Sequence, residues 1–318
     1  MKDRLSSINR FQVVALVTVA ATLLLIFVGG LVRASGAGLG CPDWPKCFGV
    51  WIPPMTVEEL PAGWDPSQFN PVHTWTEYIN RLIGVVIGLL ITATLLLSIR
   101  FRKSDPVIPI ASFTAFILVL FQAWLGGQVV RSGLAGGMIT LHMLLAMIIV
   151  NVLLFAAWRG WKERVQVYLE DRDRRRIMGI MILLLTATLV QMVLGTQVRE
   201  MIDAVKNGPI EVSREDWLNV ESTLFLVHRS FSWIILILMG GLIWTQKQLS
   251  IPIWLKKTGF AIVALINLQI LIGIGLERLD MPGALQVLHL IGVAVLICLQ
   301  FAYLLVVGTK SQISTSNS

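Results

Sequence analysis

Three histidines stand within long apolar stretches of this sequence, each close to one end of its stretch: His142, His228 and His289. An imidazole can bind a metal or carry a proton, and in hydrocarbon it is costly unless it has a partner. A single such histidine is more often a hydrogen-bonding residue between packed helices. Three at a similar depth on alternate stretches favour a functional site, because ionisable residues inside a membrane are functional candidates.

The residues around these histidines indicate which metal centre they suit. Two imidazoles that face each other from neighbouring helices are typical axial ligands of a haem held inside a helical bundle. Zinc fits less well, because cysteine and acidic ligands are absent at the depth of His228 and His289. We therefore expect His228 and His289 to be the axial ligands of one resident haem.

A second polar group, formed by Glu77, Asn80 and Arg81, opens another apolar stretch. Residues at i, i+3 and i+4 share a helix face, so Glu77 can point toward a site beside Asn80, pair with Arg81, or do both. A carboxylate beside an apolar pocket can transfer protons or stabilise a cationic intermediate. Arg81, and Arg229 at the matching place in the second half, could neutralise haem propionates, although arginines that anchor a helix would look the same. His73 is interpreted as an exposed loop residue.

Two cysteines, Cys41 and Cys47, flank the run Pro-Asp-Trp-Pro-Lys in a loop on the outer side. The outside is oxidising, so these two should form a disulfide. Closing so small a ring would stabilise the fold by about 2 kcal/mol. Both a structural and a redox-active bond are compatible with this position. Cys298 lies inside an apolar stretch and is interpreted as a small buried residue.

Composition identifies the elements that must position these residues. Of the 318 residues 55% are hydrophobic and 14% charged, and the mean hydropathy is +0.75. A helix needs roughly 20 apolar residues to cross a hydrocarbon core of about 30 Å. Eight stretches satisfy this length, so we predict an all-α integral membrane protein with eight transmembrane helices. They lie near 11–32, 79–99, 108–130, 137–158, 177–198, 223–244, 253–276 and 283–307.

The net charge of +7 points to a membrane rather than to nucleic acid, because of where the basic residues lie. With a cytoplasmic N-terminus most of them fall on the inner side, and this positive-inside bias places both termini in the cytoplasm. The first stretch is too long for a signal peptide, and no transit peptide precedes it, which favours a bacterial plasma membrane. The inner residues are Lys2, Arg4, Arg10, Arg100, Arg102, Lys103, Arg159, Lys162, Arg164, Arg172, Arg174, Arg175, Arg176, Lys247, Lys256, Lys257 and Lys310.

The apolar stretches carry an internal repeat. The first, third, fifth and seventh end in GGLVR (29–33), GGQVVR (126–131), GTQVR (195–199) and GIGLER (273–278). The same number of residues separates Arg131 from His142 and Arg278 from His289. Interfacial arginine anchors would explain each motif alone but not this matched spacing. We therefore predict two tandem four-helix bundles, 1–160 and 177–318, related by a pseudo-twofold axis along the membrane normal and joined by a cytoplasmic linker, 161–176.

The repeat places Asn80 and His142 in the first bundle where the second has His228 and His289. Asparagine is a poor iron ligand, so the first site should hold its haem through at most one protein imidazole. An iron with an open position suits a transiently bound substrate, whereas a histidine pair suits a resident electron carrier. The sequence therefore predicts two unequal haem sites.

The connection between the first two stretches, residues 34–76, is long for a membrane protein and rich in proline and tryptophan. Loops of this length are usually functional or disordered. Because tryptophan prefers the membrane interface, we expect this loop to lie over the membrane surface as a lid above the first site.

Three groups of residues together resemble the haem A synthase (CtaA) family: the run Gly40–Cys47, the run Glu77–Arg81, and the histidines of the fourth, sixth and eighth stretches. The resemblance covers essentially all eight stretches. It implies an oxidoreductase that oxidises the C8 methyl group of haem O to a formyl group, giving haem A for terminal oxidases. It also implies haem O synthase and oxidase assembly factors as partners beside the lipid bilayer, and leaves a homo-oligomer open.

Carried over residue by residue, the resemblance implies haem b bound between His228 and His289. It implies that haem O binds in the first bundle with His142 as ligand. Glu77 would be the catalytic or cation-stabilising carboxylate. Asn80, Arg81 and Arg229 complete the residues expected to contact haem.

The resemblance also implies a disulfide between Cys41 and Cys47 with a redox role. The chain departs from the family at Asn80, where many members have histidine, although sequences of a Bacteroidetes-like branch carry asparagine. Iron would then bind through His142 alone, or His73 would move in.

Two other functions agree with parts of the sequence. A non-enzymatic membrane haem-b electron-transfer protein would need His228 and His289 but neither Glu77 nor the cysteine pair. A small-molecule transporter would agree with the duplication. However, its broken helices would put glycine and proline at mid-membrane, whereas here they cluster near the helix ends.

Overall fold

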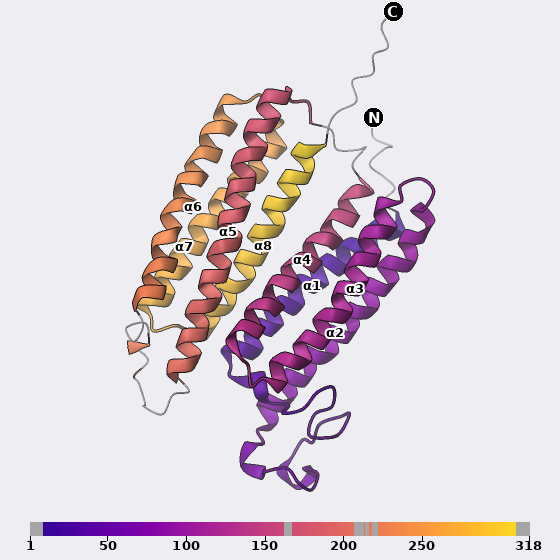
Figure 1. Ribbon diagram of the computed structural model, residues 1–318, viewed down its shortest axis with the longest axis vertical. Coiled ribbons are helices and arrows are strands. Elements are labelled where there is room, and N and C mark those ends of the chain that lie inside the picture. The colour runs from indigo at the N-terminus through magenta and orange to yellow at the C-terminus, as the bar shows by residue number, and fades with distance from the viewer. Residues whose placement is uncertain (1–8, 162–166, 207–212, 214–215, 218–221, 310–318) are drawn as a thin grey trace, which may run out of the picture. The chain divides into compact units, whose positions relative to one another are not determined.

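The computed structural model describes residues 9–161, 167–206, 213, 216–217 and 222–309 (Figure 1). Within these residues the chain is helical and forms no strand. Eight helices are long and apolar enough to cross a membrane, which confirms the predicted all-α membrane fold. Their bounds are α1 (Arg10–Ala34), α2 (Pro71–Ser98), α3 (Val107–Arg131), α4 (Gly136–Arg159), α5 (Asp171–Lys206), α6 (Ser222–Gln248), α7 (Ile253–Arg278) and α8 (Gly283–Gly308).

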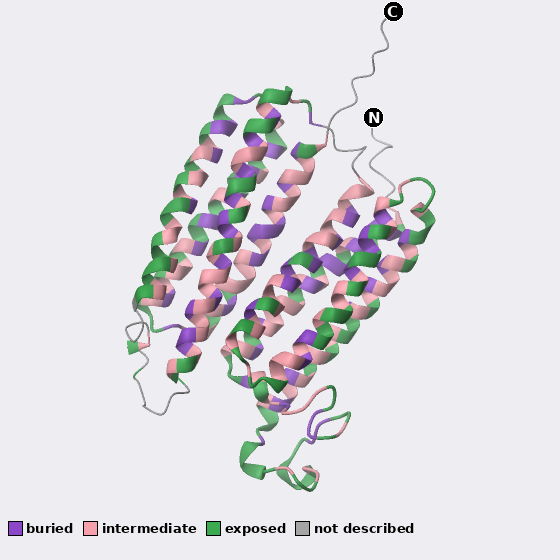
Figure 2. Cartoon of the chain, in the orientation of Figure 1, coloured by how far each residue is buried: buried purple, intermediate pink, exposed green. Residues whose placement is uncertain are grey.

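Exposed positions occur along all the membrane-crossing helices (Figure 2), and many of the side chains at these positions are apolar. Leu89, Ile237 and Leu271, for example, are 65%, 73% and 65% exposed. In water such apolar surface would drive association, whereas lipid tails are as apolar as leucine and can cover it. The chain is therefore a multi-pass membrane protein.

Helix α2 begins earlier than the predicted 79–99, which was wrong at this end. Asn70 caps the helix, because its side chain accepts the backbone N–H of His73 at 3.1 Å. Pro71 follows at the first helical position, where its missing N–H is not needed. As a result His73, which was predicted to lie in the preceding loop, belongs to the first turn of α2, and Glu77 belongs to the second turn.

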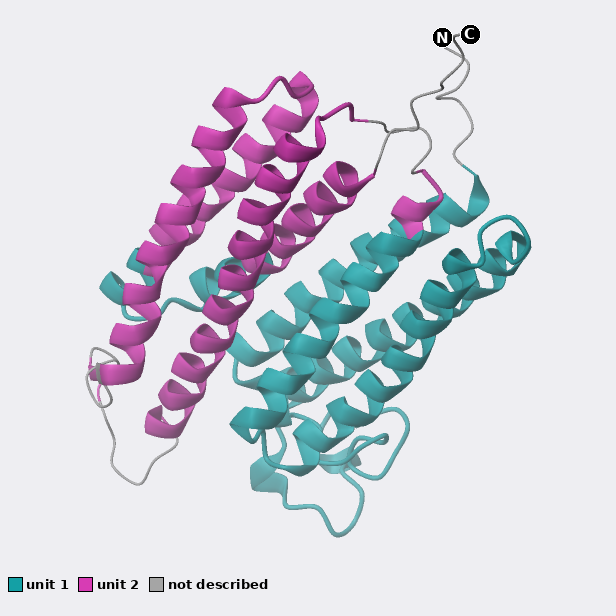
Figure 3. Ribbon diagram, turned by 45° about the horizontal axis from the view of Figure 1, so that its top comes forward, with its two compact units in different colours: residues 1–156, 274–291 teal, residues 157–273, 292–318 magenta. Residues whose placement is uncertain are grey.

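The chain divides into two compact units (Figure 3). The first contains residues 1–156 and 274–291, which include α1 to α3, most of α4, the end of α7 and the start of α8. The second contains residues 157–273 and 292–318, and the buried side chains of Met181, Leu184 and Tyr303 belong to its core. The tandem four-helix bundles and their pseudo-twofold axis stay predictions.

Arg174 is buried, although the run Arg172–Arg176 was predicted only to anchor the chain in the cytoplasm. Its guanidinium donates hydrogen bonds to the carbonyl oxygens of Val307, Thr309 and Val167. The last carbonyls of a helix have no partner within it, so Arg174 caps the end of α8. Other basic residues of the charge analysis lie outside the described residues: Lys2, Arg4, Lys162, Arg164 and Lys310.

The loop between α1 and α2 contains three short 3-10 helices, η1 (Ala37–Leu39), η2 (Val57–Glu59) and η3 (Pro66–Gln68). Phe48 is buried at its centre, with its ring 5.3 Å from that of Trp64 and 5.5 Å from that of Phe69. Edge-to-face aromatic pairs of this kind stabilise beyond the area that they bury. The loop therefore has a small core of its own, which also contains the cysteine pair.

Candidate functional site

The predicted disulfide is formed, since the sulfur atoms of Cys41 and Cys47 are 2.00 Å apart, and both residues are buried. Within the ring, the Asp43 carboxylate accepts the backbone N–H of Phe48 at 2.6 Å and that of Gly49 at 3.0 Å. These two hydrogen bonds hold residues 48 and 49, which follow the disulfide ring, against the ring. The buried Cys298 is the free cysteine predicted from the sequence.

The loop reaches the disulfide by passing directly over the first turn of α2. A Cβ atom on Gly40 would lie 2.4 Å from the backbone carbonyl of His73, so only glycine permits this approach. The Thr74 hydroxyl donates to the Gly40 carbonyl at 2.8 Å, which fixes the crossing. The disulfide loop therefore packs directly on the first turn of α2.

Glu77 lies one turn further along α2 and is only 4% exposed. Its Oε2 accepts the backbone N–H of Cys41 at 2.9 Å. Its Oε1 accepts the Nε and Nη2 hydrogens of Arg81, so the predicted pairing with Arg81 is formed. The carboxylate is thereby held between the disulfide loop and the arginine.

Arg81 directs its remaining donors to backbone carbonyls of the loop. Nη1 donates to Asp43 at 2.8 Å and to Lys46 at 2.9 Å, and Nη2 donates to Cys41 at 3.1 Å. Together with the two bonds to Glu77, these contacts use all five N–H groups of the guanidinium. In this structure Arg81 therefore holds the loop, with Cys41 bound at its N–H by Glu77 and at its carbonyl by Arg81.

Two adjacent glycines of α3 place the loop next to a histidine. A Cβ atom on Gly127 would lie 2.8 Å from the indole of Trp44, which shows how closely the loop packs on α3. A Cβ atom on Gly126 would lie 3.2 Å from Cε1 of His142 in α4. The disulfide loop and the His142 imidazole thus contact consecutive positions of one helix.

His142 itself is partly buried, and its Nδ1 is a buried atom with no hydrogen-bond partner. The side chain of Gln122 in α3 donates to the backbone carbonyl of His142 at 3.0 Å. Asn80 of α2 is also partly buried, and its Oδ1 is a buried atom with no hydrogen-bond partner. A Cβ atom on Gly29 would lie 3.9 Å from this oxygen. His142 and Asn80 are therefore among the side chains of unit 1 that keep a buried polar atom without a hydrogen-bond partner.

His228 of α6 lies in surroundings like those of His142, although its partner glutamine, Gln191, also donates to the hydroxyl of Ser232 at 3.1 Å. A Cβ atom on Gly195 of α5 would lie 3.1 Å from its Cε1, and its Nδ1 is buried without a hydrogen-bond partner. The side chain of Gln191 donates to its backbone carbonyl at 2.9 Å. Arg229 beside it is exposed, and His289, in the second turn of α8, is partly buried.

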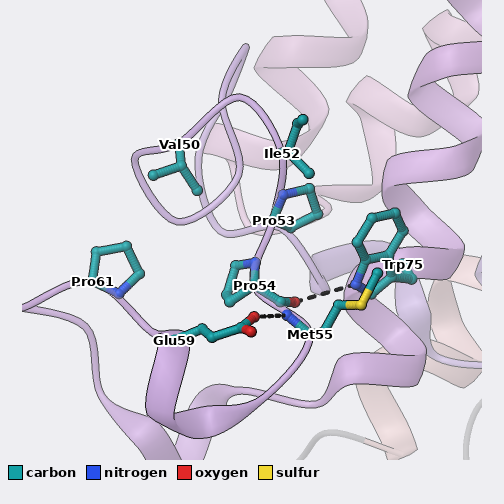
Figure 4. Close-up of a pocket in the computed structure, with 8 residues that line it drawn as sticks. All are labelled: Val50, Ile52, Pro53, Pro54, Met55, Glu59, Pro61 and Trp75. Carbon is teal, nitrogen blue, oxygen red and sulfur yellow. Dashed lines mark hydrogen bonds between the residues drawn. The ribbon is translucent and has the colours of Figure 1, made fainter.

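A groove of about 410 Å³ lies within the loop between α1 and α2 (Figure 4). Trp75 of α2 forms one wall, and its Nε1 donates to the carbonyl of Pro54 at 3.2 Å, while Glu59 accepts the N–H of Met55 at 2.8 Å. None of the residues predicted for the site lines it. Its lining is Val50, Ile52, Pro53, Pro54, Met55, Glu59, Pro61 and Trp75.

Comparison with known proteins decides the family. The family model COX15-CtaA, described as cytochrome oxidase assembly protein, matches residues 12–301. The chain belongs to this family. Within the cytochrome oxidase assembly family, one relative is the heme A synthase of Shewanella oneidensis, 24% identical over 310 residues that cover 88% of this chain and 92% of the relative.

Two further relatives carry the same name. The heme A synthase of Wolbachia pipientis wMel is 24% identical over 305 residues, which cover 84% of each chain. The heme A synthase of Bacillus cereus is 31% identical over 142 residues, which cover 45% of this chain and 41% of the relative. The first two similarities extend over most of both chains, so they concern the whole fold and not one motif.

Several residues that shape the site of this family member were not identified from the sequence. Gly40 permits the loop to cross α2, and Gly126 and Gly195 lie against the histidine rings. Gln122 and Gln191 donate to the backbone carbonyls of the histidines. A signal was present, because Gly126 and Gly195 begin two of the repeated helix-end motifs. Those motifs were interpreted as marks of an internal repeat and not as contacts of the site, since sequence alone does not say what faces a glycine.

Proposed function

We propose that this chain is a haem A synthase, an oxidoreductase that converts the C8 methyl group of haem O to the formyl group of haem A. The observation that carries the proposal is the family match over residues 12–301, with relatives named heme A synthase that align along 92% and 84% of their own length. With water as the oxygen source, the conversion releases four electrons and four protons. The site must therefore accept protons, and an electron acceptor outside the protein must take up the four electrons.

The substrate site of the proposal lies in unit 1, where His142 binds the iron of haem O. Its buried Nδ1 has no hydrogen-bond partner, and a bare glycine lies beside its ring. A buried imidazole nitrogen without a partner is costly, so a ligand such as iron is a better explanation for this histidine than a hydrogen bond to a neighbouring helix. Asn80 adds no imidazole, so the proposal leaves one axial position of the substrate iron open.

Glu77 is proposed as the catalytic carboxylate. An ionised carboxylate offers about four acceptor positions, and three donors, one from Cys41 and two from Arg81, occupy most of them. The group can therefore accept one further proton or stabilise a cationic centre without moving. Its fixed position suits general base catalysis, in which geometry must be right before basicity matters.

The resident cofactor of the proposal is haem b, with His228 and His289 as its axial ligands. The surroundings of His228 fit this use, because its Nδ1 is buried and unsatisfied and its ring rests on Gly195. When bound, haem b would supply one-electron transfer. Arg229, which is exposed, is proposed to pair with a propionate. For Arg81 that use would require release of the loop carbonyls, so we assign it to holding the loop.

The cellular setting of the proposal follows from the charge pattern. We place the protein in a bacterial plasma membrane with both termini in the cytoplasm, because most basic residues then lie inside. Haem O synthase is the proposed supplier of substrate, and oxidase assembly factors are proposed to receive the product. A homo-oligomer is compatible with the exposed apolar surface of the helices.

The test is pigment extraction from cells that contain a haem O synthase and this chain but no other haem A synthase. Formyl haem should accumulate above a control strain that lacks the chain. If none appears while the membranes contain the protein, the enzymatic proposal fails. The alternative, a non-enzymatic haem-b electron carrier, predicts a haem b spectrum in the purified protein and no formyl product.

A further inference from the structure

Helices α3 and α5 present the same pair of residues to the helix that follows each of them. In α3 the pair is Gln122 and Gly126, and in α5 it is Gln191 and Gly195. Residues four apart lie on one face of a helix, one turn above the other. Each pair meets the next helix at a histidine, His142 in α4 and His228 in α6.

The glycine of each pair forms a flat surface for the imidazole. The distance from a Cβ built on the glycine to Cε1 is 3.2 Å for His142 and 3.1 Å for His228. Real Cβ atoms rarely approach a neighbour so closely, so any larger residue would displace the ring. The ring position is therefore determined on one side by the absence of a side chain at Gly126 and Gly195.

The glutamine of each pair binds the backbone of the same histidine. Nε2 of Gln122 lies 3.0 Å from the carbonyl oxygen of His142, and Nε2 of Gln191 lies 2.9 Å from that of His228. A helical carbonyl has a second lone pair available for such a bond. Both glutamines leave a buried Oε1 without a hydrogen-bond partner, which is costly where no water is present.

The glutamine contact with a histidine backbone is made by α3 and α5. Gln269 of α7 stands as many residues before His289 as Gln122 stands before His142, but both polar atoms of its side chain are buried without a hydrogen-bond partner, so it does not bind the His289 backbone. In the first helix the residue four before Gly29 is Leu25. The side chain that contacts the region of Gly29 is Asn80, which is not an imidazole.

We infer that Gln122 and Gln191 are positioning residues, which hold the backbones of His142 and His228 so that each ring is presented to haem iron in one orientation. The inference rests on the proposed function, because it assigns a purpose to the histidines. The glycine and glutamine contacts act at two points, ring and carbonyl. The helix can then neither slide nor rotate relative to its neighbour without breaking one of them.

The experiment uses the full-length protein with its haem and compares three substitutions. Gln191→Met and Gln122→Met keep side-chain length and remove the donor. Gln300→Met is the matched control, because Gln300 is also a fully buried amide and donates to the hydroxyl of Thr188 at 3.0 Å, away from any histidine backbone. The readout is the low-field EPR signal of oxidised haem b, which depends on the orientation of the axial imidazoles.

We expect Gln191→Met to shift the EPR signal at unchanged haem b content and Gln300→Met to leave it at the wild-type position. Gln122→Met should leave the haem b signal unchanged, but lower both the haem O that copurifies and the formyl haem formed, the latter about tenfold. A wild-type signal in Gln191→Met, or an equal shift in Gln300→Met, overturns the positioning inference. Wild-type protein that forms no formyl haem would instead overturn the proposed function.

A second variant covers the case in which Gln191→Met does not accumulate. Gln191→Glu keeps the side-chain length and, in its protonated form, the donor to the His228 carbonyl. The inference requires this variant to keep the wild-type EPR signal. A shifted signal in Gln191→Glu would overturn it.

Discussion

The carboxylate of Glu77 and the backbone N–H of Cys41 are hydrogen-bonded at 2.9 Å, across the junction between α2 and the disulfide loop. The acid proposed for catalysis and the cysteine pair therefore form one structural unit. Arg81 completes it, because it binds both the Glu77 carboxylate and the Cys41 carbonyl. A substitution at any of the three residues should therefore alter the hydrogen bonds of the other two.

Replacing Glu77 by glutamine removes its charge but keeps an oxygen that can accept the Cys41 N–H. We expect formyl haem to fall at least about 100-fold, the usual contribution of a general base. The haem b spectrum should not change. Glu58→Gln, at an exposed carboxylate of the same loop, is the control and should retain activity. Retained activity in Glu77→Gln would contradict the catalytic assignment, and loss of the haem b spectrum would contradict the two separate sites.

Arg81→Met removes the donors that hold three loop carbonyls and the Glu77 carboxylate. A hydrogen bond to a charged group contributes about 1.5–3 kcal/mol, and every 1.4 kcal/mol is a factor of ten. We therefore expect the disulfide to be reduced at least about tenfold faster by a water-soluble thiol. The measurement is thiol labelling of Cys41 and Cys47 in a Cys298→Ser background.

The control for that experiment is Arg131→Met, which changes an exposed arginine at the end of α3. Its reduction rate should match that of the Cys298→Ser background. Equal rates for Arg81→Met and Arg131→Met would mean that the arginine does not hold the loop.

Gly40→Ala should lift the disulfide loop from α2, because the added Cβ would lie 2.4 Å from the His73 carbonyl. Backbone atoms cannot move aside as a flexible side chain can, so we expect a destabilisation of about 1–3 kcal/mol. Thermal unfolding in detergent, followed by tryptophan fluorescence, measures it. Gly84→Ala in α2 meets no atom within 4 Å and should be stable to within about 0.5 kcal/mol. If both variants unfold at the same temperature, the close crossing does not hold in solution.

The two glycines beneath the histidine rings allow a test of the two sites separately. Gly195→Ala should displace the His228 ring by a few tenths of an ångström and shift the haem b spectrum. Gly126→Ala should do the same to His142, lowering formyl haem while the haem b spectrum stays normal. Gly179→Ala, in α5 with nothing within 4 Å, is the control for Gly195→Ala. A haem b spectrum that responds to Gly126→Ala but not to Gly195→Ala would reverse our assignment of the sites.

The eight membrane helices could be predicted from the sequence because apolar length is a local property of the chain, and the structure confirms them. The start of α2 was placed too late because that criterion detects only the part that would lie in hydrocarbon. The two turns before it depend on capping by Asn70 and on Pro71, signals that the sequence also contained. The disulfide was predictable as well, since two cysteines six residues apart in one loop have few other partners.

The sequence by itself thus determined the membrane class, the helices, the cysteine pair and the candidate imidazoles and carboxylate. Only the tertiary structure decided that Arg81 gives all its donors to Glu77 and the loop, that Gly40 lies on the backbone of α2, and that Gly126 faces His142. The physical reason is that burial in lipid depends on the residues of one segment. A hydrogen bond between two segments, or the contact of a histidine ring with a glycine, depends instead on which distant segments pack together and in what register.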